Sequence, residues 1–299
     1  MKCITILFIG FFLCLGTKAQ TLKDPVYFNY SALPFTNPEN GKGQLDINYF
    51  ETNLAIPVTL GKKVQLINAF YYRYSDFDFN SDFTNQRFSD NLHDIRYSAI
   101  IRAEISERIE LISIGRVMVR SDLQSNLGGN DFFPFGLLLA NYAIKGNPDF
   151  TIGFGIALVN DFNYNSIIPI ASLNYETDKV KLEIVYPNIN FLFKKSESFE
   201  FGLFANVDGN ISLISQQNIG LNDANVQFQR NLQILVAPTV SHRIYKQVFG
   251  HLKIGLAPLT ELQYLDSSYE KIEGYTQRFN PSLFIRTGIS YDCLTNIIL

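Results

Sequence analysis

Charged side chains recur at every second position in several stretches that are otherwise apolar. The clearest stretch runs from Leu92 to Asp122. Because successive side chains of a β-strand point to opposite faces, this spacing gathers charges on one face and leaves the other apolar. The candidates for an inward-facing, charged surface are Arg73, Asp94, Arg96, Arg102, Glu104, Arg116, Arg120, Lys181, Glu183, Arg278 and Arg286.

Two kinds of chemistry fit a face that carries both signs of charge. One is a structural network of ion pairs that fills the inside of a closed sheet. The other is a charged constriction that selects solutes, since charges inside a membrane protein commonly mark a pathway. Mixed signs favour the network, because carboxylates and guanidinium groups satisfy one another.

The three histidines, His93, His242 and His251, are the candidates for acid–base chemistry. A lipid hydrolase needs a serine–histidine pair oriented by a third polar group. Ser241 directly precedes His242, but neighbours on a strand face opposite sides, so we do not expect this pair to react. No glycine-rich phosphate loop follows a strand and opens a helix. We therefore expect no catalytic residues, no metal site and no cofactor, with the histidines at the surface or rim.

The stretch from Leu92 to Asp122 predicts a β-hairpin. Ile95, Tyr97 and Ile101 fall on its apolar face, and residues 106–108 make a polar turn. Each strand exceeds the usual length of roughly five to six residues. Each is also long enough to cross a bilayer at a tilt, which takes about 9–11 residues.

The same alternation predicts strands along most of the chain. Besides the hairpin, the expected ranges are 26–33, 44–60, 64–75, 134–146, 150–161, 165–177, 180–186, 188–194, 199–211, 226–244, 248–263 and 275–291. Tight polar turns near residues 62, 107, 148, 178, 196 and 246 alternate with longer loops, as the periplasmic turns and external loops of outer-membrane barrels do. Counting both 26–33 and 188–194 gives fourteen strands, and dropping both gives twelve. We favour fourteen.

Five prolines lie inside expected strands: Pro57, Pro169, Pro238, Pro258 and Pro281. A closed barrel has no edge, so each proline removes a hydrogen-bond donor from a ladder. We expect these positions to mark bulges or strands that are split in two.

The N-terminus predicts a secretory signal peptide. Lys2 is followed by the apolar run 4–15 and then by Thr17-Lys18-Ala19, which fits cleavage before Gln20. Residues 20–299 then form a single domain. Cys293 is the one cysteine of that domain, so we expect neither an internal disulfide nor a cysteine metal site. The formal net charge of −3, without a basic block, does not suggest a nucleic-acid partner.

The composition combines abundant apolar residues with low overall hydropathy. The chain is 46% hydrophobic and has 26 Phe and 16 Tyr, yet its mean hydropathy is only +0.03. Beyond the signal peptide, no apolar run approaches the roughly 18 residues of a membrane helix. Apolar residues dispersed at period two are typical of a transmembrane β-barrel.

These features together resemble a known family. The Ala19–Gln20 boundary, the long alternating strands, the tight polar turns and Ala55-Ile56-Pro57 ahead of Gly61 resemble the uncharacterised outer-membrane β-barrel proteins of Bacteroidota, grouped as a domain of unknown function. The resemblance covers residues 25–291. It implies an antiparallel, up-and-down transmembrane barrel in the outer membrane of a Gram-negative, Bacteroidota-like cell. The family has no established catalytic residues, so it implies none here.

Three functions are compatible with these sequence features. The first is an integral outer-membrane barrel that is structural or a narrow, porin-like passive channel, with outer-membrane lipid and an unidentified small solute as its partners. The second is an outer-membrane lipid hydrolase. The third is a soluble, secreted β-sandwich binding domain.

Overall fold

The computed structural model describes residues 25–80, 82, 88–159, 166–185, 187–215 and 226–291 of the 299-residue chain, without the side chain of residue 148. The expected signal peptide, residues 1–19, lies outside the described residues.

The described chain is almost entirely β-structure. Its strands are β1 (Val26–Thr36), β2 (Leu45–Gly61), β3 (Val64–Phe79), β4 (Asn91–Glu104), β5 (Ile109–Ser121), β6 (Phe132–Ile144), β7 (Asn147–Val159), β8 (Ser166–Glu176), β9 (Val180–Val185), β10 (Asn188–Ser196), β11 (Phe199–Leu213), β12 (Phe228–Tyr245), β13 (Val248–Leu265), β14 (Lys271–Phe279) and β15 (Ser282–Tyr291). A single 3₁₀ turn, η1 (Gly129–Asp131), precedes β6. None of the described residues forms a helix with the length and apolar character needed to cross a bilayer.

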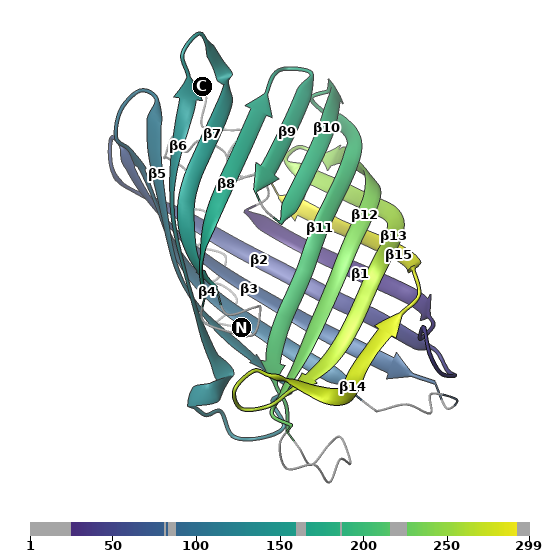
Figure 1. Cartoon of the computed structure of the whole chain (residues 1–299). Coiled ribbons are helices and arrows are strands. Elements are labelled where there is room, and N and C mark those ends of the chain that lie inside the picture. The colour runs from purple at the N-terminus through teal and green to yellow at the C-terminus, as the bar shows by residue number, and fades with distance from the viewer. Residues whose placement is uncertain are drawn as a thin grey trace, which may run out of the picture.

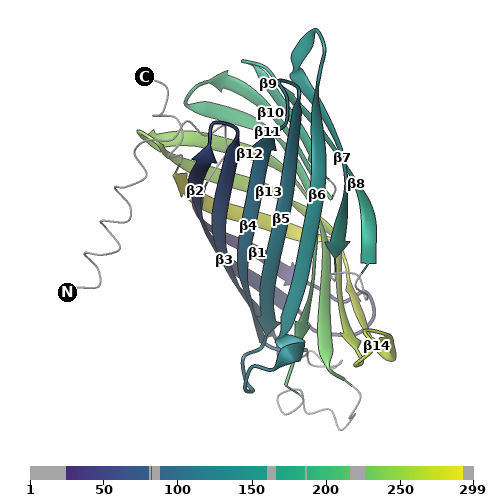
Figure 2. The ribbon, with the colours of Figure 1, turned by 90° about the vertical axis from the view of Figure 1, so that its left-hand side faces the viewer.

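The strands form one closed, antiparallel barrel (Figures 1 and 2). From β1 to β13 each strand pairs with the next, and β15 pairs with both β13 and β1, which closes the ring. β14 pairs with β13 beside residues 260–265, whereas β15 pairs with residues 248–257 of the same strand. β14 and β15 thus share one place in the ring. The expected fourteen-strand barrel is confirmed, and the alternative of a β-sandwich is wrong, since one sheet closes on itself.

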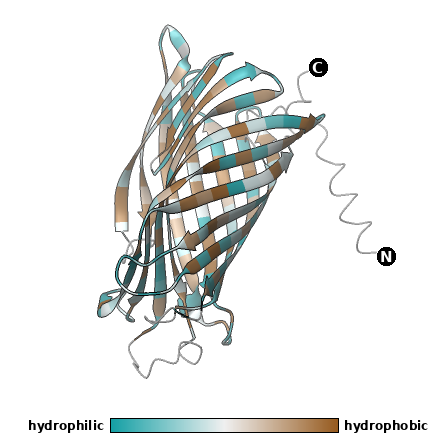
Figure 3. Cartoon of the chain, turned by 90° about the vertical axis from the view of Figure 1, so that its right-hand side faces the viewer, coloured by the Kyte–Doolittle hydropathy of each residue, from teal (hydrophilic) through white to brown (hydrophobic). Residues whose placement is uncertain are grey.

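The outer surface of the barrel carries the apolar residues of the alternating pattern. Ile95, Tyr97 and Ile101 are 45%, 42% and 43% exposed, and Phe154 is 67% exposed. Their neighbours in sequence point into the barrel, which gives the alternating colours along each strand in Figure 3. A closed ladder satisfies the backbone without water, and an apolar outer face suits lipid. The fold is therefore that of a membrane-spanning barrel.

The connections differ between the two ends of the barrel. Six tight turns, at residues 62–63, 105–108, 145–146, 177–179, 197–198 and 246–247, lie at one end, hereafter the turn end. The opposite end is the loop end. One expected turn is displaced: residues 147–149 belong to β7, and the turn itself is Lys145–Gly146. Gly146 has a φ of +85°, a conformation that favours glycine.

The strand prolines occupy irregular or singly paired positions. Pro281 separates β14 from β15, and Pro258 lies in a bulge of β13. Pro57 lies in the part of β2 beyond its pairing with β1, and Pro169 in the part of β8 beyond its pairing with β9. The pairing of β12 with β13 omits Pro238. A missing N–H is tolerated where a ladder is interrupted or absent.

Candidate functional site

The loop end of the barrel is pinched by a contact between two strands that are not neighbours in the ring. Ser121 of β5 and Leu213 of β11 form a parallel bridge. The N–H of Asp122 donates to the Leu213 carbonyl at 3.2 Å, and the N–H of Ser215 donates to Oδ2 of Asp122 at 2.6 Å. The two walls thus join across the lumen and divide the loop end into two lobes.

The lobe enclosed by β11–β15 and β1–β5 is filled by side chains at the loop end. Its buried, apolar cluster includes Leu45, Phe77, Tyr264 and Phe279. We call this cluster the loop-end plug. A second cluster, which includes Met118, Phe133 and Phe228, packs beside the pinch. An axial path through this lobe is therefore occupied by packed apolar side chains.

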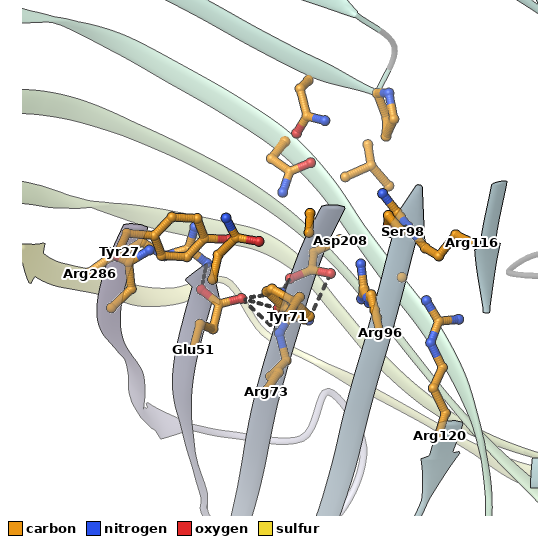
Figure 4. A pocket seen from close by; sticks show the side chains of 18 of the residues that line it. Tyr27, Glu51, Tyr71, Arg73, Arg96, Ser98, Arg116, Arg120, Asp208 and Arg286 are labelled. Carbon is orange, nitrogen blue, oxygen red and sulfur yellow. Dashed lines mark hydrogen bonds and ion pairs between the residues drawn. The ribbon is translucent and has the colours of Figure 1, made fainter. Parts of the chain in front are cut away.

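A group of ion pairs crosses the middle of the barrel (Figure 4). Nη2 of Arg73, on β3, lies 2.5 Å from Oε1 of Glu51 on β2 and 2.8 Å from Oδ2 of Asp208 on β11. The Tyr71 hydroxyl donates to the same Glu51 oxygen at 2.8 Å, and Nη2 of Arg286 lies 3.5 Å from Oε2 of Glu51. Arg73 and Glu51 are only 7% exposed, so neither charge is solvated and each depends on the other.

A second group of arginines lies next to the first along β4 and β5. Asp94 binds two of them, with Arg96 Nη2 at 2.5 Å and Arg120 Nε at 3.1 Å. Arg116 Nε donates to the Ser98 hydroxyl at 2.8 Å, and its guanidinium carbon lies 4.9 Å from the centre of the Phe135 ring. Figure 4 shows Arg96, Arg116 and Arg120 pointing toward the same space as Arg73.

These side chains surround a cavity of about 440 Å³, which we call the arginine cavity. Its lining also includes Pro187, Asn188 and residues 206–209, from the β9–β10 bend and β11. Its five guanidinium groups belong to Arg73, Arg96, Arg116, Arg120 and Arg286; the carboxylates paired with them in the two groups above are Glu51, Asp94 and Asp208. Among the described residues that line the cavity, arginines therefore outnumber carboxylates, and the cavity volume falls within the range of small-molecule sites, roughly 300–1,000 Å³.

Other residues expected in the lumen lie nearer the turn end. Arg102 Nη2 lies 2.6 Å from Oε1 of Glu110, and Lys181 Nζ lies 3.5 Å from Oε2 of Glu183. Glu104, at the end of β4, is exposed. The structure thus separates the expected charges into a buried central network and a set close to the tight turns.

Arg278 does not face the lumen. Its side chain is 60% exposed, and its Nε donates to Oε2 of Glu261 at 2.6 Å. In β14 the odd-numbered Gln277 and Phe279 are buried, whereas in β15 the even-numbered Phe284 is buried. The break at residues 280–281 shifts the alternation by one position. The sequence interpretation carried one alternation through both strands, which is why it placed Arg278 inward.

Three residues of the central network were not among the sequence candidates: Glu51, Tyr71 and Asp208. A signal was present, because each lies on the polar face of its own strand. What the sequence lacked was any means of pairing Asp208 with Arg73, 135 positions away.

The histidines differ in their surroundings. His251 Nε2 lies 2.6 Å from the Ser290 hydroxyl, and its Nδ1 contacts the hydroxyl of Ser241, so the ring bridges β12, β13 and β15. This contact links serine and histidine across two strands, and the sequence adjacency of Ser241 and His242 gave no hint of it. His93 Nδ1 lies 2.9 Å from the Tyr72 hydroxyl, and His242 is exposed. Within the described ranges, no group of three or more His, Cys, Asp or Glu is arranged to hold a metal ion.

A model of the family described as "Domain of unknown function (DUF6268)" matches residues 16–292. The chain belongs to this family. No curated protein matches it. The DUF6268 barrel is thus assigned to a family whose description states no activity, and the resemblance drawn from its sequence extends to that family but not to a Bacteroidota origin.

Several solved structures are similar to this DUF6268 barrel. The COG4313 outer membrane channel from Pseudomonas putida F1 is 10% identical, with a TM-score of 0.43, over 90% of this chain and 96% of that one. The TodX monoaromatic hydrocarbon channel is 8% identical, with a TM-score of 0.42, over 90% and 91%. The NanC porin is 6% identical, with a TM-score of 0.38, over 89% and 98%. At such identities no residue role transfers to this chain.

Proposed function

We propose that this protein is a narrow passive channel of the outer membrane that favours small anionic solutes. The observation that supports the proposal most strongly is the arginine cavity, whose described lining includes five arginines and two carboxylates, Glu51 and Asp208. Fixed positive charge in a narrow, poorly screened passage raises the local concentration of anions.

The dimensions of the lumen support a small conductance. Fourteen places in the ring are fewer than the sixteen to eighteen strands that leave a wide aqueous channel in porins. The loop-end plug and the β5–β11 contact narrow the barrel further. Both chemistries expected from the sequence, a structural ion-pair network and a charged constriction, contribute to this proposal. The ion pairs of Arg73 brace the walls, and the arginines of the cavity make the electrostatic potential of the lumen positive.

Planar-bilayer recording of the purified, full-length protein tests this proposal. Under a salt gradient, we expect small current steps with a reversal potential on the anion-selective side. A large, steady conductance without ion preference would refute the narrow cationic passage. Complete absence of current in repeated insertions would also contradict it and would favour a purely structural barrel.

A lipid hydrolase is the second candidate, and the Ser241–His251–Ser290 contacts are the observation that favours it. In a catalytic triad one ring nitrogen faces the nucleophile and the other an orienting carboxylate. Here the described contacts of both ring nitrogens are with serine hydroxyls. We assign the hydrolase second place because the arginine cavity supports the channel more directly. Labelling of Ser241 or Ser290 by a serine-reactive phosphonate would reverse this assignment.

The cellular setting completes the proposal. We infer a Gram-negative, Bacteroidota-like outer membrane as the location, on the basis of the barrel fold and the resemblance stated above. We infer cleavage of residues 1–19 on export from the N-terminal sequence pattern. The expected partners are outer-membrane lipid around the apolar belt and a small solute in the lumen, without nucleic acid. N-terminal sequencing of the mature protein and membrane fractionation test both points.

A further inference from the structure

In the part of the chain that the structure describes, the strand pairing of the wall is interrupted between β8 and β11. β9 pairs with β8 only at residues 172–176, and β10 pairs with β11 only as far as Asn206. The last backbone bond of this side runs from the N–H of Val207 to the Pro187 carbonyl at 3.4 Å. Among the described residues, no strand pairs with residues 166–171 of β8 on the side away from β7, or with residues 207–212 of β11 on the side away from β12.

We call this interruption the side notch. Figure 1 shows β9 and β10 turning back well short of the lower ends of β8 and β11. The wall next to the notch is apolar on its outer face, where Phe154, Ile156 and Ile167 are 67%, 53% and 72% exposed. The notch therefore lies at the level of the lipid-facing belt and not above it.

The inner face of the wall on the β8 side of the notch is apolar as well. Leu139, Ala157, Val159 and Ile170 form a buried cluster there, and Phe135, Leu137 and Ile168 pack against it. We call this surface the inner apolar wall. Phe135, Leu137 and Ile168 are only partly buried, so this wall presents apolar surface to the lumen, where exposure to water is unfavourable.

The arginine cavity borders the other side of the notch. Pro187, Asn188 and residues 207–209, which form the β10–β11 side of the notch, also line the cavity. Arg116 joins the two surfaces, since its guanidinium group lines the cavity and lies against the ring of Phe135. One continuous region thus runs from lipid, along the inner apolar wall, to a cluster of guanidinium groups.

We propose that the side notch admits an amphiphile with a small anionic headgroup and an apolar chain, moving between the bilayer and the arginine cavity. The chain lies along the inner apolar wall, and a carboxylate or phosphate headgroup accepts hydrogen bonds from guanidinium groups of the cavity, Arg116 among them. The inference rests on the proposed function in that the same cavity is the solute site. It adds a substrate class and a lateral route from the bilayer. The axial route along the lumen is narrowed by the β5–β11 contact and the loop-end plug.

The chain offers a clean reporter for this site, because it contains no tryptophan. Asn188→Trp places a single indole at the rim of the notch, where Asn188 is exposed and lines the cavity. Ile189→Trp, one residue on and 44% exposed on the lipid-facing side, is the matched control. Each variant is reconstituted as the full chain in vesicles that contain either a fatty acid brominated near its carboxyl end or the methyl ester of that acid, at a pH that ionises the carboxyl group.

We expect the ionised acid to quench the tryptophan at position 188 at about a tenfold lower mole fraction than the ester does, a ratio that corresponds to about 1.4 kcal/mol. The control at position 189 is expected to respond equally to both. Adding Arg116→Gln to the Asn188→Trp chain should reduce the preference to about twofold or less. Equal quenching by acid and ester at position 188, or the same preference at both positions, would overturn the proposal.

A second measurement needs no reporter. Detergent-purified, otherwise unmodified protein should retain radiolabelled fatty acid, release it to excess unlabelled acid but not to acetate, and lose retention with Arg116→Gln. Retention that the ester displaces equally well would count against the anionic headgroup. Bilayer currents separate the two proposals: anion-selective current without acid preference refutes only the lateral site, and acid preference without current refutes only the passive channel.

Discussion

Arg73 on β3 and Asp208 on β11 form an ion pair across the lumen, with 2.8 Å between Nη2 and Oδ2. The same guanidinium group holds Glu51 on β2, so one side chain ties together two regions of the barrel wall. Because the pair spans the lumen and does not line one strand, it both braces the barrel and narrows it.

Removing the charge of Asp208 should weaken the barrel without abolishing it. Asp208→Asn leaves Arg73 paired with Glu51, so we expect the free energy of unfolding in detergent to fall by about 1.5–3 kcal/mol, the contribution of a hydrogen bond to a charged group. Denaturant titration, followed by far-UV circular dichroism because the chain has no tryptophan, measures the change in the free energy of unfolding. Glu197→Gln is the control, since Glu197 is 93% exposed and its contact with Arg243 is 3.9 Å long. Equal stability of the two variants would show that the cross-lumen pair contributes nothing.

The stability cost of an arginine on the outward face should depend on its depth in the bilayer. Val117 is 50% exposed within β5, and Val117→Arg should cost about 2–4 kcal/mol if it lies near the bilayer midplane. Ile105→Arg, at a 61% exposed position in the turn after β4, should cost about 0–1 kcal/mol, as expected near the interface. Folding yield into vesicles and unfolding titrations measure the stability cost of each variant. If Ile105→Arg cost more stability than Val117→Arg, the lipid-facing belt would not lie at the level of Val117.

The loop-end plug should behave as a packed core. Phe279 is 1% exposed within it, so Phe279→Ala should lower stability by about 3–5 kcal/mol. Phe35→Ala is the matched control, because Phe35 is 67% exposed. If Phe279→Ala were as mild as the control, the loop end would not be filled by packed side chains.

Local patterns were sufficient to predict most of the barrel. The hairpin formed by β4 and β5 was predicted with its turn, because the alternation runs the length of both strands despite exceptions such as Ile100. The alternation fails at residues 280–281, where one place in the ring is built from two strands and Arg278 points outward. No period-two pattern carries information about such a break beyond the proline itself.

The candidate site was only partly accessible from sequence for a different reason. Charges on one face predict a charged lumen, but which of them meet depends on barrel closure and on the pinch between β5 and β11. The Arg73–Asp208 pair and the side notch both follow from how far strands pair across the ring, and pairing length is a tertiary property. Neither composition nor alternation predicts the length over which two strands pair.

The central claim is that the excess of arginines around the cavity sets an anion preference, and the reversal potential of single insertions under a salt gradient tests it most directly. We predict an anion-selective potential for the unmodified protein, a shift toward cations with Arg286→Gln, and a shift toward anions with Asp208→Asn, since the two changes alter the charge of the same lumen in opposite directions. Shifts in the same direction, or a potential that neither substitution moves, would contradict the account.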